Sequence, residues 1–138
     1  MADKNFFVDI VSPSKLVFSG EVLSLTAPGT LGGFQVLYNH ADLLTSLTVG
    51  EIKLVTVEGN TEYFATSGGF LEVKKNKVII LTETVEKSNQ IQIERAKEKI
   101  LESKKLLQEK PKEINSDLVR ESILKAKNRI KVAERDSK

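Results

Sequence analysis

The pattern of apolar and polar residues along the chain changes once, close to residue 87. Before this point, short runs rich in β-branched and aromatic residues follow one another closely, among them NFFVDIV, EIKLVTV and KVIILTE. The groups PGTLGG, EGN, SGG and KKNK separate such runs, and they supply Gly or Asn where a tight turn needs a positive φ. Because no helical pattern interrupts the strands, we predict a flattened antiparallel β-sandwich or barrel of about ten strands.

Two local patterns make more specific predictions within this β region. Gly20 separates the runs KLVFSG and EVLSLTA, which are therefore expected to form two strands. In EIKLVTV, the apolar residues are Ile52, Leu54, Val55 and Val57, and we expect Lys53 and Thr56 to face the other way.

After residue 87, apolar and small residues recur at spacings of three and four, which is the period of an α-helix. Two such stripes are present: Ile93, Ala96, Ile100, Ser103 and Leu107, then Val119, Ile123, Ala126, Ile130 and Ala133. Asn89, with Gln92 three residues later, is expected to begin the first helix as a capping box. Pro111 is expected to end it, and the second helix is expected to begin at Asn115 or Ser116.

The two matched stripes predict a C-terminal antiparallel two-helix hairpin, and hence a sandwich domain at 1–86 and a hairpin domain at 87–138. Each stripe has three large apolar residues, and its small residues bury little apolar surface. Helices of this length are marginal in water without packing. We therefore expect a hairpin that either folds against the sandwich or opens along a partner, at a cost of a few kcal/mol.

Composition narrows the classes of function. The chain has no Cys and one His, so a disulfide framework and a thiolate metal site are excluded, and no metal site is predicted. No apolar run approaches the ~18–20 residues of a membrane-spanning helix, and the N-terminal residues do not resemble a signal peptide. We therefore expect the protein to act in the compartment where it is made.

Charge is distributed unevenly between the two regions. Residues 1–86 hold six basic and ten acidic side chains, a net charge of −4, whereas residues 87–138 hold fifteen basic and nine acidic ones, a net charge of +6. A step of this kind at a change of secondary structure indicates two parts with different partners. The C-terminal part is expected to meet an acidic surface.

The sequence contains no recognisable catalytic constellation. His40 has Asp42 two residues later, but no nucleophile stands beside a base, so we interpret His40 as a structural or interface residue. The basic segment from Lys125 to Lys131, KAKNRIK, has three interpretations: a solvated helix face, a surface that docks on an acidic protein, or a nucleic-acid contact. The second helix has no aromatic residue for base stacking, which disfavours nucleic acid.

Four motifs carry a resemblance that covers the whole chain. They are NHADLLTSLTVGEIKL (39–54), SGGFLEVKKNKVIILTET (67–84), IQIERAK (91–97) and NRIKVAER (128–135). With these motifs in this order, the chain resembles the epsilon-subunit family of F-type ATP synthases, in its bacterial form. The resemblance implies a flattened β-sandwich followed by a two-helix hairpin, in agreement with the patterns above.

The resemblance also implies a non-catalytic rotor subunit, which is not an enzyme by itself and needs no cofactor. Family members bind the gamma subunit through the sandwich, sit on the ring of c subunits and couple proton-driven rotation to ATP synthesis. In bacterial members the hairpin extends into the catalytic head of alpha and beta subunits and restrains ATP hydrolysis. The implied partner-binding residues are Asn39, His40, Lys125, Lys127, Arg129 and Lys131.

The family's place in the cell follows from that role. The resemblance implies a peripheral subunit at the cytoplasmic face of the bacterial inner membrane. It is held there only through the complex, and it has no nucleic-acid partner.

A second hypothesis is that the folded hairpin senses ATP. Some bacterial family members bind ATP with a pattern I/L-D-x-x-R-A at the start of the first helix. Ile91, Arg95 and Ala96 match this pattern, whereas Gln92 stands at the aspartate position. Gln92 is neutral, so a charge-assisted hydrogen bond would be lost, which weakens binding roughly tenfold to a hundredfold.

The rest of the family's ATP site matches in part. The family uses a glutamate shortly before the pattern, a role that Glu86 could fill, and arginines of the second helix. Arg129 matches one of these arginines, and Lys125 replaces another. Because Lys lacks the planar fork for bidentate phosphate contacts, the resemblance implies at most a weak regulatory ATP site.

Overall fold

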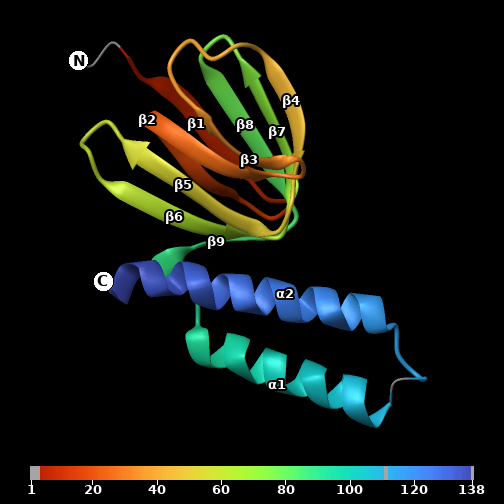
Figure 1. Ribbon diagram of the computed structural model, residues 1–138. Coiled ribbons are helices and arrows are strands. Elements are labelled where there is room, and N and C mark those ends of the chain that lie inside the picture. The colour runs from red at the N-terminus through yellow and green to blue at the C-terminus, as the bar shows by residue number, and fades with distance from the viewer. Residues whose placement is uncertain (1–3, 111, 138) are drawn as a thin grey trace. The chain divides into compact units, whose positions relative to one another are not determined.

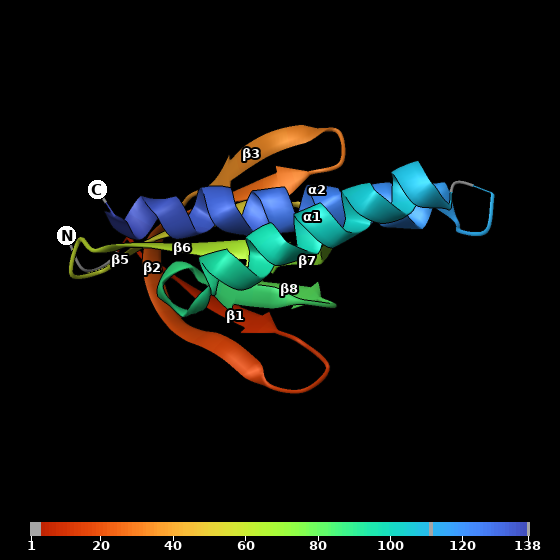
Figure 2. The same ribbon diagram turned by 90° about the horizontal axis from the view of Figure 1, so that it is seen from below.

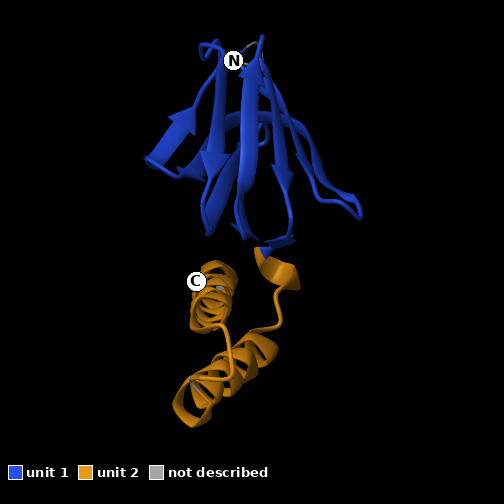
Figure 3. Ribbon diagram, turned by 90° about the vertical axis from the view of Figure 1, so that its right-hand side faces the viewer, with its two compact units in different colours: residues 1–87 blue, residues 88–138 orange. Residues whose placement is uncertain are grey.

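The computed structural model describes residues 4–110 and 112–137, and the chain divides into two compact units, Met1–Lys87 and Ser88–Lys138 (Figure 3). Within the described residues, the first unit holds the strands and the second holds the helices. That each unit is an independently folding domain remains a prediction.

The first unit is a flattened β-sandwich, which confirms the predicted fold class (Figure 1). Its nine described strands are β1 (Phe6–Val11), β2 (Leu16–Gly29), β3 (Gly32–Val36), β4 (Leu43–Leu47), β5 (Gly50–Thr56), β6 (Thr61–Thr66), β7 (Gly69–Lys74), β8 (Lys77–Thr82) and β9 (Val85–Lys87). The hydrogen-bonded order is β1-β8-β7-β4-β2-β5-β6-β9, with β3 beside β2. Because β1 also pairs with β2, the long β2 closes part of the sheet into a ring.

Three details of the sandwich differ from the sequence prediction. β2 runs unbroken through Gly20, because residues on both sides of this glycine pair with β1. β1 and β8 run parallel, with Val8 opposite Val78, whereas all strands were predicted to be antiparallel. The short β9, which pairs with β6, was not predicted. The parallel pair joins strands that are far apart in the sequence, a pairing that local patterns do not specify.

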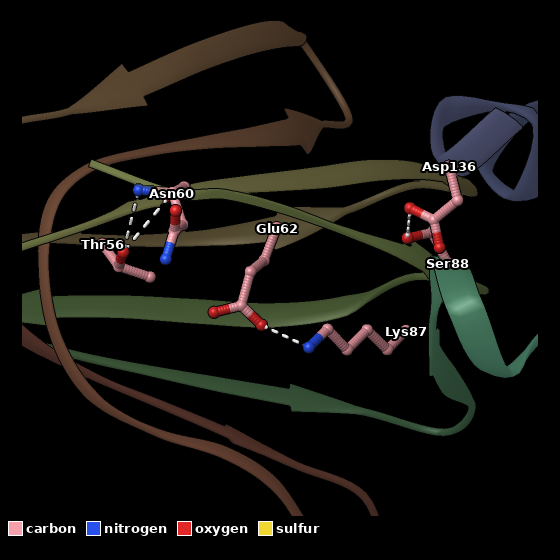
Figure 4. Close-up of polar contacts among 6 residues, drawn as sticks. All are labelled: Thr56, Asn60, Glu62, Lys87, Ser88 and Asp136. Carbon is pink, nitrogen blue, oxygen red and sulfur yellow. Dashed lines mark hydrogen bonds and ion pairs between the residues drawn. The ribbon is translucent and has the colours of Figure 1, made fainter. Parts of the chain in front are cut away.

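The core of the sandwich is built from alternate residues of its strands, as the burial of every second residue in β1 illustrates. In β5, Ile52 and Leu54 are buried and Lys53 is exposed, as predicted. Thr56, predicted to face outward, is buried instead, because strict alternation places it on the core face. Its hydroxyl oxygen accepts a hydrogen bond from the Asn60 N–H at 3.2 Å and donates to the Asn60 carbonyl at 3.3 Å (Figure 4).

The second unit is the predicted antiparallel helical hairpin. It consists of α1 (Ile93–Glu109) and α2 (Ser116–Ala133), which contact each other and lie side by side in Figure 1. Seen from below, in Figure 2, the two helices overlap. A short 3₁₀ turn, η1 (Ser88–Gln90), precedes α1, and a second one, η2 (Glu134–Ser137), follows α2.

The seam between the helices consists of the two predicted stripes. In α1, the five stripe residues are buried or half-buried, and every other residue of this helix is exposed. In α2, the five stripe residues are likewise buried or half-buried. Val132, which lies outside the predicted stripe, is also fully buried. The residues buried most deeply in the α1 stripe are Ala96 and Ser103, so the most buried positions of this helix carry small side chains.

The start of α2 agrees with the sequence prediction, and the start of α1 does not. The predicted capping box at Asn89 is wrong, because Ser88–Gln90 form a 3₁₀ turn and α1 begins only after Gln92, whose side chain makes no capping hydrogen bond. Asn115 caps α2 as predicted, since its side-chain oxygen accepts from two backbone N–H groups of the first turn, at 3.1 and 3.3 Å. Pro111, expected to end the first helix, lies outside the described residues.

Polar contacts fix the residues on either side of the boundary between the units, each within its own unit. In the first unit, Lys87 Nζ lies 2.7 Å from Glu62 Oε1 (Figure 4). In the second unit, the buried Ser88 hydroxyl donates to Asp136 Oδ1 at 2.8 Å. The latter bond ties the segment before α1 to the turn after α2, so it closes the hairpin at its open end.

Candidate functional site

The helical unit contains a polar hollow between its two helices. The hollow has a volume of about 510 Å³ and is lined by Arg95, Glu98, Lys99 and Glu102 of α1 and by Arg129 of α2. The four α1 residues recur at spacings of three and four, so they lie on one side of this helix. The volume is in the range of small-molecule sites. Arg95 and Arg129, both predicted for an ATP site, are therefore brought together.

The other residues predicted for the ATP site do not line this hollow. Ile91 and Ala96 are buried, so they have a packing role. Gln92 is the N-cap of α1, and its carbonyl oxygen accepts from the Ala96 N–H at 3.1 Å. Glu86 lies in β9 of the first unit, where it pairs with Ala65 across the sheet. Lys125 is likewise absent from the lining of the hollow.

The four basic residues predicted to bind a partner occupy two sides of α2. Positions two apart on a helix point in nearly opposite directions, whereas positions four apart share a face. Lys125 and Arg129 therefore share one side; Lys125 forms an ion pair with Glu121 at 3.0 Å, and Arg129 lines the hollow. Lys127 and Lys131 share another side and are exposed.

Asn39 and His40 lie in a loop of the sandwich that is held by side-chain hydrogen bonds. The Asn39 N–H donates to Asn76 Oδ1 at 2.7 Å, and Asn76 Nδ2 donates to Asn39 Oδ1 at 3.0 Å. Both asparagines have a positive φ of 62°, a conformation that Asn tolerates better than most residues. His40 Nδ1 is 2.7 Å from the Ala41 carbonyl, which can only accept, so this nitrogen carries the proton. The loop therefore has a defined conformation.

The sandwich also has an exposed apolar patch, which was not predicted from the sequence. Its central residues, Val11, Leu81 and Phe70, are neighbours across β1, β8 and β7. Together with Pro13 they line a depression of about 330 Å³. Phe70 is 58% exposed and Leu81 is 53% exposed, so these large side chains lie on the surface rather than in the core.

The same face of the sheet continues the apolar character and adds acidic residues. Two residues from Phe70 along β7 stands Glu72, which pairs with Leu44 of β4 on one side and with Ile79 of β8 on the other. Leu44 is 72% exposed. Glu83 lines the depression beside the central residues. Apolar patches with a polar rim of this kind are typical of surfaces that bind another protein.

Within residues 4–110 and 112–137, no cluster of His, Asp and Glu side chains could hold a metal ion. In the same part of the chain, no helix combines the length and the apolar character needed to cross a membrane.

Several known proteins with similar sequences are ATP synthase epsilon chains. A family model described as "ATP synthase, Delta/Epsilon chain, beta-sandwich domain" matches residues 5–88. The ATP synthase epsilon chain of Desulforamulus reducens is 40% identical over 129 residues, which are 92% of this chain and 96% of that protein. The ATP synthase epsilon chain of Chlorobaculum tepidum is 50% identical over 84 residues, which are 61% of this chain and 96% of that relative. The latter relative is therefore close in length to the first unit alone.

A solved structure supports the fold over both units. A chain in the cryo-EM structure of the Euglena gracilis mitochondrial ATP synthase, comprising OSCP, F1 and the c-ring, matches with a TM-score of 0.69. The match covers 96% of this chain and 79% of that chain, at 16% sequence identity. At this identity the likeness concerns the fold alone.

Proposed function

The chain belongs to the ATP synthase epsilon-chain family, and from this membership we propose that it is a non-catalytic subunit of the central stalk of a bacterial F-type ATP synthase. In this role it binds the gamma subunit, contacts the c-ring and couples proton-driven rotation to ATP synthesis, which occurs on other subunits. It is peripheral to the cytoplasmic face of the membrane. Asn39 and His40, on their fixed loop, contact a partner within the complex.

The observation that carries this proposal is the apolar patch on the sandwich. Phe70 and Leu81 expose large apolar surfaces that a protein partner would bury, at roughly 25 cal/mol per Å². We assign this patch to the gamma subunit, because the sandwich is the part that family members are expected to present to gamma. The acidic Glu72 and Glu83 at its rim add attraction to basic residues of the partner.

Co-purification with the gamma subunit of the same complex tests this assignment. Phe70→Glu places a charge in the middle of the patch, and we expect it to weaken gamma binding at least tenfold, because a charge would be buried without a partner. Val57→Glu is the matched control. Val57 is also an exposed apolar residue, but it lies in the turn between β5 and β6, outside the patch. Unchanged gamma binding by Phe70→Glu would refute the assignment of the patch.

The helical hairpin acts as a latch in this proposal, meaning that it opens and restrains ATP hydrolysis by the catalytic head. The small-residue seam around Ala96 and Ser103 supports this role, since such a seam contributes limited apolar burial to the closed state. An assembled enzyme that carries residues 1–87 alone should hydrolyse ATP faster than one that carries the full chain. Equal rates across ATP concentrations would argue against the latch.

The basic residues lie on two sides of α2, so charge-reversal variants can distinguish an opened hairpin from a closed one. An opened α2 presents both sides, so reversing Lys125 and Arg129 to Glu should release inhibition as strongly as reversing Lys127 and Lys131. A folded hairpin presents Lys127 and Lys131 more fully, because Lys125 is paired with Glu121 and Arg129 lines the hollow. An effect confined to Lys127 and Lys131 would therefore mean that the hairpin docks while closed.

Sensing of ATP by the closed hairpin is the second candidate function. It is favoured by the hollow, in which Arg95 and Arg129 come together from different helices. Calorimetry of the full chain tests it, because a sensor should saturate at sub-millimolar to millimolar ATP. The double variant Arg95→Gln/Arg129→Gln should then lose binding, and its retention would place the nucleotide elsewhere.

A further inference from the structure

The long strand β2 has a free edge over its first half. Val22 pairs with Phe6 of β1 and with Thr56 of β5, so these two strands lie on opposite sides of β2. β5 pairs with β2 only from Val22 onward. Among the described strands, none pairs with residues 16–21 on the β5 side. Unpaired strand edges are templates that another strand can join.

The backbone groups of Ser19 point out of this edge. The Phe7 N–H donates to the Asn76 carbonyl at 3.0 Å, so the backbone groups of Phe7 face β8. Because these groups alternate between the two sides of a strand, those of Val8 face β2, where Val8 pairs with Gly20. Gly20 therefore bonds to β1, and Ser19, the residue before it, directs its N–H and C=O away from β1.

A groove of about 530 Å³ adjoins the free edge. Ser19 lies in its wall, together with the rings of Phe7 and Phe18 and the three carboxylates of Glu21, Glu58 and Glu62. All its lining residues belong to the sandwich, and none of them lines the depression at the apolar patch. The groove is therefore a separate surface with aromatic and acidic walls.

Two lysines of the sandwich show that the walls of this groove attract cations. Lys87 Nζ lies 2.7 Å from Glu62 Oε1 (Figure 4), and Lys77 Nζ lies 5.8 Å from the centre of the Phe7 ring. The other two carboxylates of the groove are exposed, and neither has an ion-pair partner within residues 4–110 and 112–137. Their charge can pair with cations of a binding partner.

We propose that the free edge of β2 and this groove bind a basic, extended segment of a partner protein, which adds as a strand beside residues 16–21. The backbone groups of Ser19 form hydrogen bonds with the added strand. Lys or Arg side chains of the segment pair with Glu21 and Glu58, and their apolar stems cover the rings of Phe7 and Phe18. In strand addition the main-chain bonds supply affinity and the side chains supply specificity, so an acidic segment is excluded.

Titration of the full chain with capped five-residue peptides tests the proposal. The probe has the sequence Lys-Val-Lys-Val-Lys, and Glu-Val-Glu-Val-Glu is its charge-reversed counterpart. We expect the basic probe to bind saturably and to slow hydrogen exchange of the Ser19 amide, followed by NMR, about tenfold or more. The acidic peptide should not bind. A basic probe that does not bind, or that leaves the exchange of Ser19 unchanged, would overturn the proposal.

Paired variants locate the charges that attract the probe. Glu21→Gln/Glu58→Gln should weaken its binding about fivefold, because two exposed ion pairs are lost. Glu72→Gln/Glu83→Gln is the matched control, since it removes two exposed glutamates of the same unit that lie outside the groove, and it should leave the affinity unchanged. An unchanged affinity in the first variant, or a loss in the control instead, would place the probe elsewhere and overturn the assignment.

Two N-methylated forms of the basic probe separate strand addition from attraction by charge alone. Methyl groups on the backbone nitrogens of the second and fourth residues block one edge of the peptide, and those on the first, third and fifth residues block the other edge. An added strand bonds to β2 through one edge only, so the two forms should differ about tenfold in affinity. Equal affinities would refute strand addition. Gamma binding by the Phe70→Glu variant reports on the central-stalk role separately, so either proposal can fail alone.

Discussion

A chain that ends at Lys87 should fold into the same sandwich as the full protein. The buried apolar cluster lies entirely between Phe6 and Val85, and all strand pairs, including β6–β9, lie within the first unit. The ion pair of Lys87 with Glu62 at 2.7 Å also remains. The relative from Chlorobaculum tepidum, which is close in length to this unit, shows that an epsilon chain of such size occurs naturally.

The expected loss of stability is small. Truncation places a terminal carboxylate beside Lys87, and partly exposed ion pairs such as Glu62–Lys87 contribute at most about 1 kcal/mol. The free energy of unfolding of the sandwich should therefore fall by no more than about 1 kcal/mol. As an internal standard, Leu54→Ala removes a fully buried side chain and should cost about 2–5 kcal/mol in either length of chain.

Tyrosine fluorescence during urea unfolding is a suitable assay. Both tyrosines, Tyr38 and Tyr63, lie in the first unit, and the chain has no Trp, so the signal reports on the sandwich alone. The truncated and full chains should show one cooperative transition each, with equal m-values. A truncated chain without a cooperative transition, or a Leu54→Ala cost that differs by more than about 1 kcal/mol between the two lengths, would refute the independence of the units.

Three further predictions concern individual residues. Asn115→Ala removes two hydrogen bonds that cap α2, so the helical unit should lose about 1 kcal/mol, seen as an earlier loss of helical circular dichroism on heating; an unchanged melt would contradict this. Ser88→Ala and Asp136→Ala should each destabilise the helical unit by about 1 kcal/mol, and the double variant by hardly more, because both remove the same bond; additive losses would show that the bond is not shared. Gly69→Ala should destabilise the sandwich by more than about 2 kcal/mol, because a Cβ there would overlap a backbone carbonyl of β8, whereas Gly32→Ala, with open space around it, should cost only about 1 kcal/mol for its positive φ; equal costs in urea unfolding would contradict the steric argument.

Features with a local period were predicted well from the sequence. Each helical stripe, from Ile93 to Leu107 and from Val119 to Ala133, repeats at three and four, so the buried face of each helix followed without knowledge of its neighbour. Thr56 shows the limit of residue type as a guide. Thr56 faces the core because it alternates with Ile52 and Leu54 along the strand. Its buried hydroxyl is hydrogen-bonded to the backbone of Asn60.

Features that depend on the meeting of distant segments were not predicted. The apolar patch needs Val11, Phe70 and Leu81 on neighbouring strands, and the parallel pairing of β1 with β8 is set by the tertiary structure. Glu98 and Glu102 were visible as charges on a helix, but the hollow they line exists only once α2 packs beside α1. The ATP-binding pattern I/L-D-x-x-R-A singled out Gln92 by its residue type alone, since a sequence pattern does not say where a side chain lies.

The hairpin combines a weak seam with specific contacts at its ends, and this combination suits a switch. Ala96, Ser103 and Ala126 let the helices approach closely, but such small side chains bury little apolar surface. Directional polar bonds, such as the one from Ser88 to Asp136, which joins the two ends of the unit, therefore add to the preference for the closed state. A hydrogen bond of this kind contributes about 1 kcal/mol, so the loss of a single contact shifts a two-state equilibrium roughly fivefold. Opening can thus be adjusted at the ends of the hairpin without any change to the seam itself.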